Sequence, residues 1–218
     1  MPFYIQRSNS NNDKTYKKNR TKPLLIGLTL IPSFVFANDL SQLPQKERVA
    51  YFTQAQQAGI TGVAIKTKPV LARPAKEGEI ITTIIKGEGI ETVSEPAKAG
   101  DWVVQNICPE TGNEEILVRK NKFIQRYSET DKNKIKINIT SYPDNYQPFI
   151  PKGIEMNYFI VPESTPAFAM KAPWGELQRF QSGDAVVQST TDSQDVYRIQ
   201  KAAFECTYTI LKPAKLAQ

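Results

Sequence analysis

The spacing of hydrophobic residues changes along the chain, and it predicts one helix near the N-terminus and several short strands. Residues 44–58 carry apolar side chains at threefold spacing between a proline and a glycine, which is typical of a short helix. Residues 134–140 alternate between polar residues and isoleucine, as expected for a strand with one buried face. Residues 79–85 are rich in isoleucine and threonine and also predict a strand.

One stretch of the sequence occurs twice. Residues 100–106 read Gly-Asp-Trp-Val-Val-Gln-Asn, and residues 183–189 read Gly-Asp-Ala-Val-Val-Gln-Ser. Each copy closes with a Phe-x-x-x-Tyr pair: Phe123 with Tyr127, and Phe204 with Tyr208. Because the order and the spacing agree in both places, we interpret the pattern as an internal duplication.

Each copy has a direct structural interpretation. The Gly-Asp pairs are structural turn signals, since glycine accepts a positive φ and aspartate can bond to the backbone two residues further on. These pairs are Gly100 with Asp101, and Gly183 with Asp184. The valines that follow begin a strand, and a polar loop leads into a second strand, so each copy predicts a hairpin. A short helix comes next, and its Phe and Tyr are expected to be structural core residues.

These elements predict an α+β fold of two pseudo-repeated small modules, each a short antiparallel sheet with one short helix, after an N-terminal helix. A module of about 55 residues is marginal as a lone domain, so the two are expected to pack together. The expected segments are a signal peptide, an N-terminal helical segment, module 1, a strand-bearing linker, module 2 and a tail: residues 1–37, 38–69, 70–128, 129–157, 158–212 and 213–218.

Basic residues are concentrated at the N-terminus. The 218-residue chain has a formal net charge of +6, of which residues 1–37 hold +5. A basic stretch precedes an apolar run over residues 23–37, and Ala37 ends a Val-Phe-Ala sequence suited to cleavage by a signal peptidase. We therefore expect a periplasmic or secreted protein with no stable membrane anchor after cleavage. An uncleaved anchor is the alternative, although the run is shorter than the roughly 20 residues of a spanning helix.

The charge beyond the leader gives no reason to expect a nucleic-acid partner. The residues after position 37 carry 22 basic and 21 acidic side chains, so the mature chain is nearly neutral. Proteins that bind nucleic acid through charge alone show a clear excess of basic residues. The expected partner is instead an unknown ligand or protein of the cell envelope.

Cys108 and Cys206 are the only cysteines, and histidine is absent. In an oxidising compartment such a pair predicts a disulfide, which would close a loop of 98 positions and contribute about 4–5 kcal/mol in the chain-entropy model. Two free thiols are the alternative, and a catalytic thiol is disfavoured because no histidine can activate it. Two cysteines cannot hold a structural zinc ion alone, so the sequence predicts no metal site and no cofactor.

Asp101 and Asp184 are weak catalytic candidates, because two carboxylates at equivalent positions can share acid–base work. The favoured alternative is that each caps its own turn. Four glutamates near glycines are expected to form a solvated face rather than a calcium site: Glu77, Glu79, Glu88 and Glu91. Two tryptophans beside turns are expected at the rim of the core rather than as sugar-stacking platforms: Trp102 and Trp174.

Around the first Gly-Asp turn the chain resembles the PGDYG-type modules, which are small bacterial and phage domains with no settled function. The resemblance covers residues 70–128 and rests on Lys-Ala-Gly-Asp-Trp at 98–102, the valines that follow, Glu-Glu-Ile at 114–116 and the Phe-x-x-x-Tyr pair. Ala99 stands where that pattern has a proline. Residues 158–210 resemble the pattern less closely. The resemblance implies a compact α+β module and no activity.

The sequence therefore predicts an exported, non-catalytic protein that binds or assembles something at the cell envelope. One alternative is a carboxylate-dependent envelope hydrolase that uses Asp101 or Asp184 with a nearby glutamate. Another alternative is a secreted effector. We favour the non-catalytic reading because no residue pattern in the chain specifies a reaction.

Overall fold

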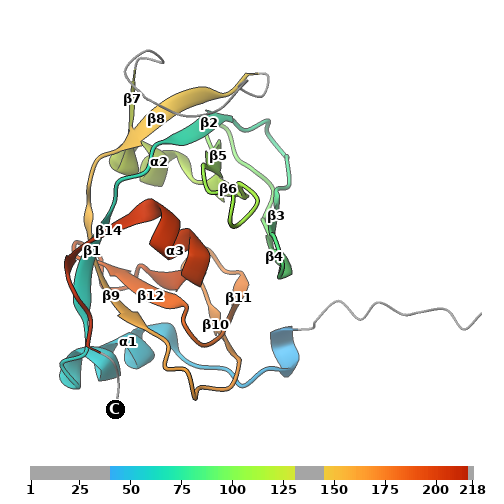
Figure 1. The fold of residues 1–218 in the computed structure, drawn as a ribbon. Coiled ribbons are helices and arrows are strands. Elements are labelled where there is room, and N and C mark those ends of the chain that lie inside the picture. Colours follow the sequence, from blue (N-terminus) through green and yellow to red (C-terminus); the bar gives the residue numbers. More distant parts are fainter. Residues whose placement is uncertain (1–39, 131–144, 216–218) are drawn as a thin grey trace, which may run out of the picture. The chain divides into compact units, whose positions relative to one another are not determined.

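The computed structural model describes residues 40–130 and 145–215 (Figure 1). Within these two stretches the strands outnumber the helices, and every strand pair is antiparallel. The strands form two five-stranded sheets and two separate hairpins. The fold is thus a mixture of helices and antiparallel sheets, as the predicted α+β class requires.

The first sheet has the strand order β6-β5-β2-β8-β7. Its strands are β2 (Val70–Pro74), β5 (Trp102–Asn106), β6 (Glu115–Val118), β7 (Tyr127–Glu129) and β8 (Gln147–Pro151). Helix α2 (Lys120–Arg126) connects β6 to β7. We call residues 70–129 the first half.

The second sheet has the order β13-β12-β9-β1-β14. Its strands are β1 (Gly62–Lys66), β9 (Glu155–Ile160), β12 (Ala185–Ser189), β13 (Val196–Ile199) and β14 (Tyr208–Lys212). Helix α3 (Lys201–Thr207) connects β13 to β14, as α2 does in the first sheet. We call residues 155–212 the second half.

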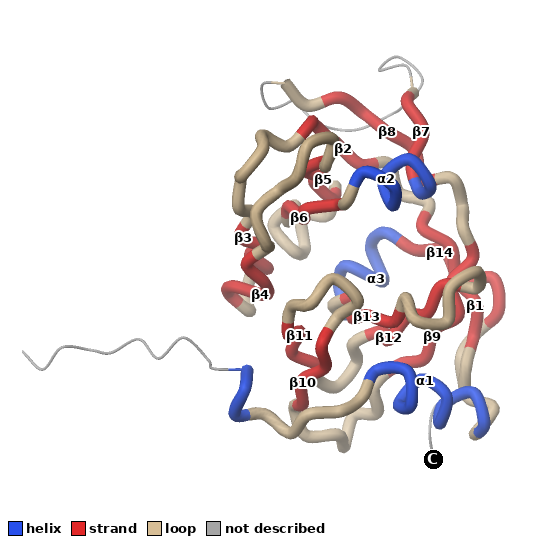
Figure 2. The backbone as a smooth tube through the Cα atoms, turned by 180° about the vertical axis from the view of Figure 1, so that it is seen from behind, coloured by secondary structure: helices blue, strands red, loops and turns tan. Residues whose placement is uncertain are grey.

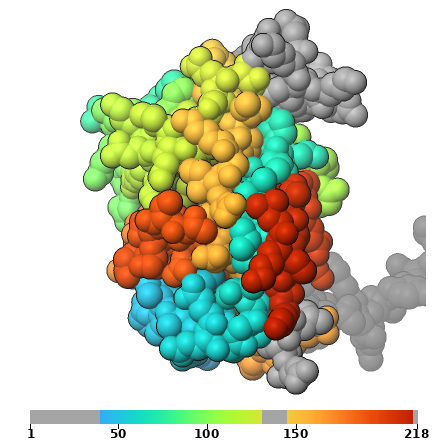
Figure 3. All heavy atoms as spheres, turned by 90° about the vertical axis from the view of Figure 1, so that its left-hand side faces the viewer, coloured from blue at the N-terminus to red at the C-terminus, as the bar shows by residue number. Residues whose placement is uncertain are grey.

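Each sheet contains one strand that precedes the other half in the sequence. β1 leads directly into β2, yet it lies between β9 and β14 in the second sheet. β8 leads directly into β9, yet it lies between β2 and β7 in the first sheet. Figure 3 shows the cyan β1 beside the red C-terminal strand, from which it is far away in the sequence. Because of this exchange, neither half completes its own sheet.

The segment that the sequence predicts as a linker contributes strands to both sheets. β8 lies within residues 129–157, and β9 begins there at Glu155 rather than at the predicted module boundary. The strand predicted for residues 134–140 lies outside the described residues.

Helix α1 (Arg48–Gln57) forms within the segment for which the threefold spacing predicts a helix. It follows a short 3₁₀ helix, η1 (Leu40–Gln42). The Glu47 carboxylate caps α1 by accepting two backbone N–H groups of its first turn. The buried side chains of α1 are Phe52 and Ala55, which belong to the predicted apolar face.

Each half also contains a hairpin outside its sheet (Figure 2). In the first half β3 (Thr82–Ile85) pairs with β4 (Gly89–Val93), and in the second half β10 (Phe168–Lys171) pairs with β11 (Leu177–Phe180). Both hairpins stand at the same place in the chain, between the first strand of the half and the strand that follows the Gly-Asp turn.

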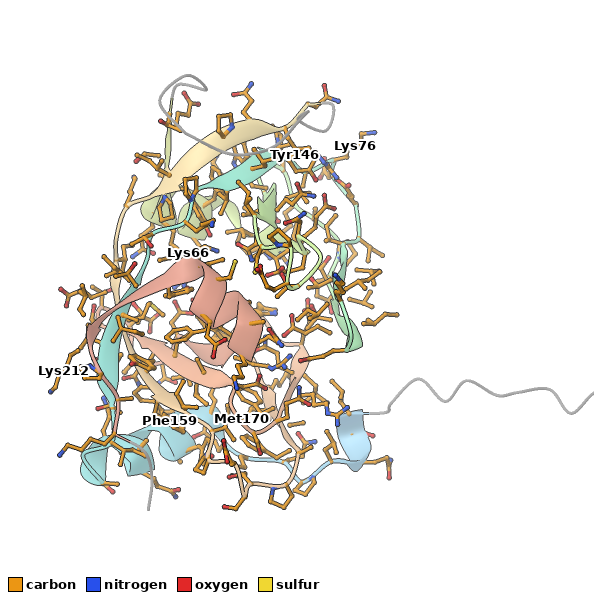
Figure 4. All side chains as sticks on the ribbon, viewed as in Figure 1. Lys66, Lys76, Tyr146, Phe159, Met170 and Lys212 are labelled. Atoms are coloured by element: carbon orange, nitrogen blue, oxygen red, sulfur yellow. The ribbon has the colours of Figure 1, made fainter. Side chains whose placement is uncertain are left out.

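The β10–β11 hairpin shares a core with α1 and the second sheet. Its buried members include Phe52 of α1, Phe159 of β9, and Phe168, Met170 and Phe180 of the hairpin. Figure 4 labels Phe159 and Met170, which lie close to α1. Burial of these large side chains, at roughly 1.5–3 kcal/mol each, holds α1 in place.

Candidate functional site

Asp101 joins the first Gly-Asp turn to the helix that follows it. Its Oδ2 accepts the backbone N–H of Lys98 at 2.9 Å, and its Oδ1 accepts that of Lys120, the first residue of α2, at 3.0 Å. The Arg119 guanidinium donates to Oδ2 at 2.6 Å. Burial raises the pKa of this carboxyl, but the three hydrogen bonds outweigh burial and hold the pKa below its usual value.

Asp184 makes equivalent contacts in the second half. Its Oδ2 accepts the backbone N–H of Gln181 at 2.9 Å, and its Oδ1 accepts that of Lys201, the first residue of α3, at 3.1 Å. Asp184 is fully buried. Burial raises the pKa of its carboxyl, and the charge of Arg198 and the two backbone donors oppose that rise only in part.

The glycine before each aspartate has the same backbone conformation in both turns. The φ angle is 89° at Gly100 and 87° at Gly183, a conformation that favours glycine. A Cβ atom would lie 2.8 Å from the Lys120 side chain at the first turn and 2.9 Å from the Lys201 side chain at the second. The repeated Gly-Asp pair is therefore accounted for by local structure, as a turn fastened to a helix N-terminus.

Arg198 is a buried arginine that the sequence analysis did not single out. It donates to Asp184 through Nε at 2.7 Å and Nη2 at 3.1 Å. It also donates to Glu91 through Nη1 at 2.7 Å and to Glu88 through Nη2 at 2.9 Å. Arg198 lies on β13, whereas Glu91 lies on β4 and Glu88 in the turn before it. One guanidinium thus ties the hairpin of the first half to the second sheet.

The expectation of a solvated glutamate face is wrong for three of the four glutamates, because Glu79, Glu88 and Glu91 each form an ion pair. Glu88 and Glu91 pair with Arg198, and only 12% of the Glu91 side chain is exposed. Burial raises the pKa of Glu91, against the attraction of Arg198. Glu79 pairs instead with Arg73 at 2.6 Å.

The Phe-x-x-x-Tyr pairs occupy equivalent positions in the two cores. The ring centroids are 5.2 Å apart for Phe123 and Tyr127 and 5.1 Å apart for Phe204 and Tyr208. Trp102 stacks on Phe123 at 4.2 Å, so its face is not open to a sugar ring. These rings pack against the buried valines and alanines of their own sheet.

The other tryptophan lies nearer the surface. Trp174 is 39% exposed, and its indole N–H donates to Glu176 at 3.1 Å. Its ring centroid is 5.4 Å from that of Tyr197. Trp174 therefore lies at the rim of the second core.

Cys108 and Cys206 meet at the junction of the two halves. Cys108 is buried in the β5–β6 loop, and Cys206 is half-buried on α3. Both are free thiols, with their sulfur atoms 2.5 Å apart. Burial and the neighbouring Cys108 and Glu110 raise the pKa of the Cys206 thiol to about 12. The disulfide stays a prediction, for which the fold supplies the proximity that the sequence alone did not.

The outward face of the β3–β4 hairpin is apolar and exposed. Thr82 lies opposite Val93 and Ile84 opposite Ile90, so the four side chains share one face. The exposed fractions are 56% for Ile84, 67% for Ile90 and 52% for Val93. We call this set, together with the neighbouring Ile80, the hairpin face. No residue within 40–130 and 145–215 buries it.

The corresponding pairs of the β10–β11 hairpin are buried. Phe168 lies opposite Phe180 and Met170 lies opposite Gln178, in a regular register, whereas the register of β3–β4 shifts between Thr83 and Ile84. Phe168, Met170 and Phe180 are at most 1% exposed. Helix α1 covers them, with the rings of Tyr51 and Phe168 at 5.2 Å. The two hairpins thus differ in whether the chain itself provides a covering helix.

Several predictions concern residues beyond the described ranges. The signal peptide of residues 1–37, its cleavage after Ala37 and the end of the tail predicted for residues 213–218 belong to this group. None of the helices within residues 40–130 and 145–215 has the length and apolar character needed to cross a bilayer.

Comparisons with known proteins leave the family open. No protein family, curated protein or solved structure matches the chain significantly. The resemblance to PGDYG-type modules therefore stays a prediction that rests on the motif alone.

Sequence reasoning missed three features of the site: Arg198, Glu110 and the hairpin face. A signal existed for Arg198, because the predicted duplication aligns it with Leu117 and a charge at an otherwise apolar strand position needs a buried partner. Glu110 gave no such signal, since a glutamate in a polar loop is ordinary. The hairpin face gave none either, because Ile84 and Ile85 have the same side chain and only the fold decides which is buried.

Proposed function

We propose that the protein is an exported, non-catalytic binding or assembly protein of the cell envelope that binds its partner through the hairpin face. The observation that carries the proposal is the exposure of Ile84, Ile90 and Val93 on one side of a single hairpin. Single exposed apolar residues are ordinary on protein surfaces, whereas a contiguous apolar face is typical of an interaction site.

The proposed partner is an apolar helix face of another envelope protein. The support comes from the second half, where α1 lies against the paired residues Phe168 and Phe180 of the corresponding hairpin. We interpret the two halves as pseudo-repeated modules, because their sheets have the same strand order and their Gly-Asp turns make the same contacts. On this interpretation the β3–β4 hairpin lacks the helix that its counterpart has.

The hydrolase alternative has less support. Asp101 and Asp184 each accept two backbone N–H groups and an arginine, so their oxygen atoms are engaged in structural hydrogen bonds. A catalytic base must instead have an oxygen free to reach a proton of the substrate or of water.

Export and the disulfide are parts of the same proposal, and intact mass tests both. In an oxidising compartment the contact between Cys108 and Cys206 favours a bond that links the two halves. The mass of protein recovered from the periplasm should begin at Asn38 and should be two hydrogens lighter before reduction than after it. A full-length mass with two free thiols would overturn export and the disulfide together.

Site-specific photo-cross-linking in the producing cells tests the binding surface. A photoreactive amino acid at position 84 or 90 should give a discrete adduct whose cross-linked peptide is an apolar helix of a second protein. The matched control is position 124 on α2, because Ile124 is 55% exposed, as Ile84 is. An equal yield of the same adduct at position 124, or no adduct at positions 84 and 90, would refute the hairpin face as the binding site.

A further inference from the structure

Cys108, Glu110 and Cys206 bring three metal-binding side chains together where the two halves meet. Both thiols donate to the same Oε2 atom of Glu110, at 3.3 Å from Cys108 and at 3.5 Å from Cys206. The two sulfur atoms and the carboxylate oxygen all lie within 4.8 Å of one another. Among the described residues, this is the group of cysteine and acidic side chains with the geometry of a metal site.

We propose that this cluster, when both cysteines are reduced, binds one thiophilic divalent cation of the Zn²⁺ class. Its ligands would be the two sulfur atoms, the Glu110 carboxylate and a water molecule in the fourth position. Zinc accepts sulfur and carboxylate oxygen together, and three protein ligands with one open position is a common arrangement for it. Magnesium and calcium are excluded as the intended ion, because they prefer oxygen ligands throughout.

The chemistry of the ligands favours a cation. One carboxylate oxygen of Glu110 already lies within reach of both thiols. A bound dication would stabilise both thiolates and displace their protons.

The cluster has room for the small adjustment that a metal requires. Two thiolates on one tetrahedral zinc ion lie about 3.8 Å apart at the usual zinc–sulfur distance of about 2.3 Å, so the sulfur atoms must separate from their present contact. Cys206 is half-buried on the side of a seven-residue helix, and the Glu110 carboxyl is in contact with solvent. Rotation of the Cys206 side chain would separate the two sulfur atoms, and the exposed Glu110 carboxyl would follow.

Disulfide formation and metal binding exclude each other, because an oxidised pair has no thiolate to offer. The chain would hold the ion only where the cysteines stay reduced. This inference does not depend on the hairpin face, and its failure would leave the proposed binding function untouched.

Cobalt(II) titration of the full-length, reduced, metal-free protein tests the proposal directly. One Co²⁺ per chain should bind, with a thiolate-to-cobalt charge-transfer band and the intense visible bands of a four-coordinate ion, and Zn²⁺ should bleach both. C108S and C206S should each bind Co²⁺ more weakly and show at most about half of the charge-transfer intensity, because one thiolate remains in each. E110Q should weaken Zn²⁺ binding about tenfold or more in competition with a chelating dye.

The matched control is E205Q, because Glu205 is an exposed glutamate directly beside Cys206 and is not part of the cluster. Its affinity should equal that of the native chain, and protein oxidised to the disulfide should not bind. The proposal is wrong if the native chain with two titratable thiols gives no charge-transfer band. It is equally wrong if C206S keeps the native affinity and the full intensity of the band, or if E205Q weakens binding as much as E110Q does.

Discussion

The β3–β4 and β10–β11 hairpins stand at the same point of two similar halves, yet one is bare and the other is covered. In the second half, α1 lies against Phe168 and Phe180 and turns the hairpin into part of a core. In the first half, the paired Ile84 and Ile90 face solvent. The comparison separates residues that hold the fold from residues available to a partner. The function of this protein is therefore best sought where the two halves differ.

The largest expected difference is between the covered and the bare hairpin. Phe168→Ala should destabilise the protein by about 3–5 kcal/mol, because it removes a ring that is 1% exposed from the core beneath α1. Ile84→Ala, at 56% exposure, should change the free energy of unfolding by less than about 0.5 kcal/mol. Urea denaturation of both variants measures the contrast. Similar losses in the two variants would show that the hairpin face is buried in solution.

The next contrast concerns the arginines that pair with the two turn aspartates. Arg198→Leu should cost about 3–5 kcal/mol, because it leaves Asp184, Glu88 and Glu91 without their shared cation in a buried place. Arg119→Leu should cost no more than about 1 kcal/mol, because that side chain is 34% exposed and Asp101 keeps its two backbone donors. Thermal unfolding monitored by circular dichroism would rank the two variants by melting temperature. Equal shifts in melting temperature would contradict the stated asymmetry.

Substitution of the two turn glycines should destabilise the protein by similar amounts, and this tests whether the two turns are equivalent. Gly100→Ala and Gly183→Ala should each cost about 1–3 kcal/mol, because both place a Cβ on a backbone with positive φ. The lysine stems over the two glycines add a similar close contact in each half. Denaturant unfolding of the two variants gives the comparison. A difference of more than about 2 kcal/mol would mean that the two turns are not equivalent.

The smallest expected effect is on the pH dependence of stability, to which Glu91 and Asp101 should contribute in opposite directions. The folded pKa of Glu91 is raised, so its ionisation opposes folding at neutral pH and the native chain should gain stability over E91Q as the pH falls toward 4.5. The folded pKa of Asp101 is lowered, so its stabilisation is present at neutral pH and should be lost, relative to D101N, as the pH falls through 3.8 and below. Urea midpoints measured from pH 7 to pH 3 would show both trends. Parallel slopes in the two comparisons would refute the assignment.

Local features of the fold could be predicted well from the sequence. The threefold spacing located α1, and the repeated Gly-Asp pair with its valines located a turn and a strand in each half. These predictions succeed because glycine with positive φ and an amphipathic helix are properties of short segments. The exchange of β1 and β8 could not be predicted in this way. Alternation along a strand says which face is buried, but it does not say which strand lies alongside.

The candidate sites also combine residues that the sequence points to with contacts that only the fold creates. Cys108 and Cys206 were recognisable as a pair, and Glu110 lies two positions from Cys108, but only the contact of the β5–β6 loop with α3 brings Cys206 to that carboxylate. Likewise the acidic group around Glu88 and Glu91 was visible in the sequence, while its cation Arg198 lies more than a hundred positions away. Such contacts depend on the packing of elements that are distant in the sequence, and this packing produces no periodic pattern of residues.

By itself, the sequence of this protein determined the turns, the helices and the aromatic pairs that each half uses to close its own core. Those features arise from backbone conformations and side-chain spacings within a few residues. The tertiary structure alone decided which carboxylates meet Arg198, which residues surround the cysteines, and that one hairpin has a helix over it while its counterpart does not. These outcomes depend on which segments the exchanged strands bring together, and the free energy that selects them is spread over contacts between residues far apart in the chain.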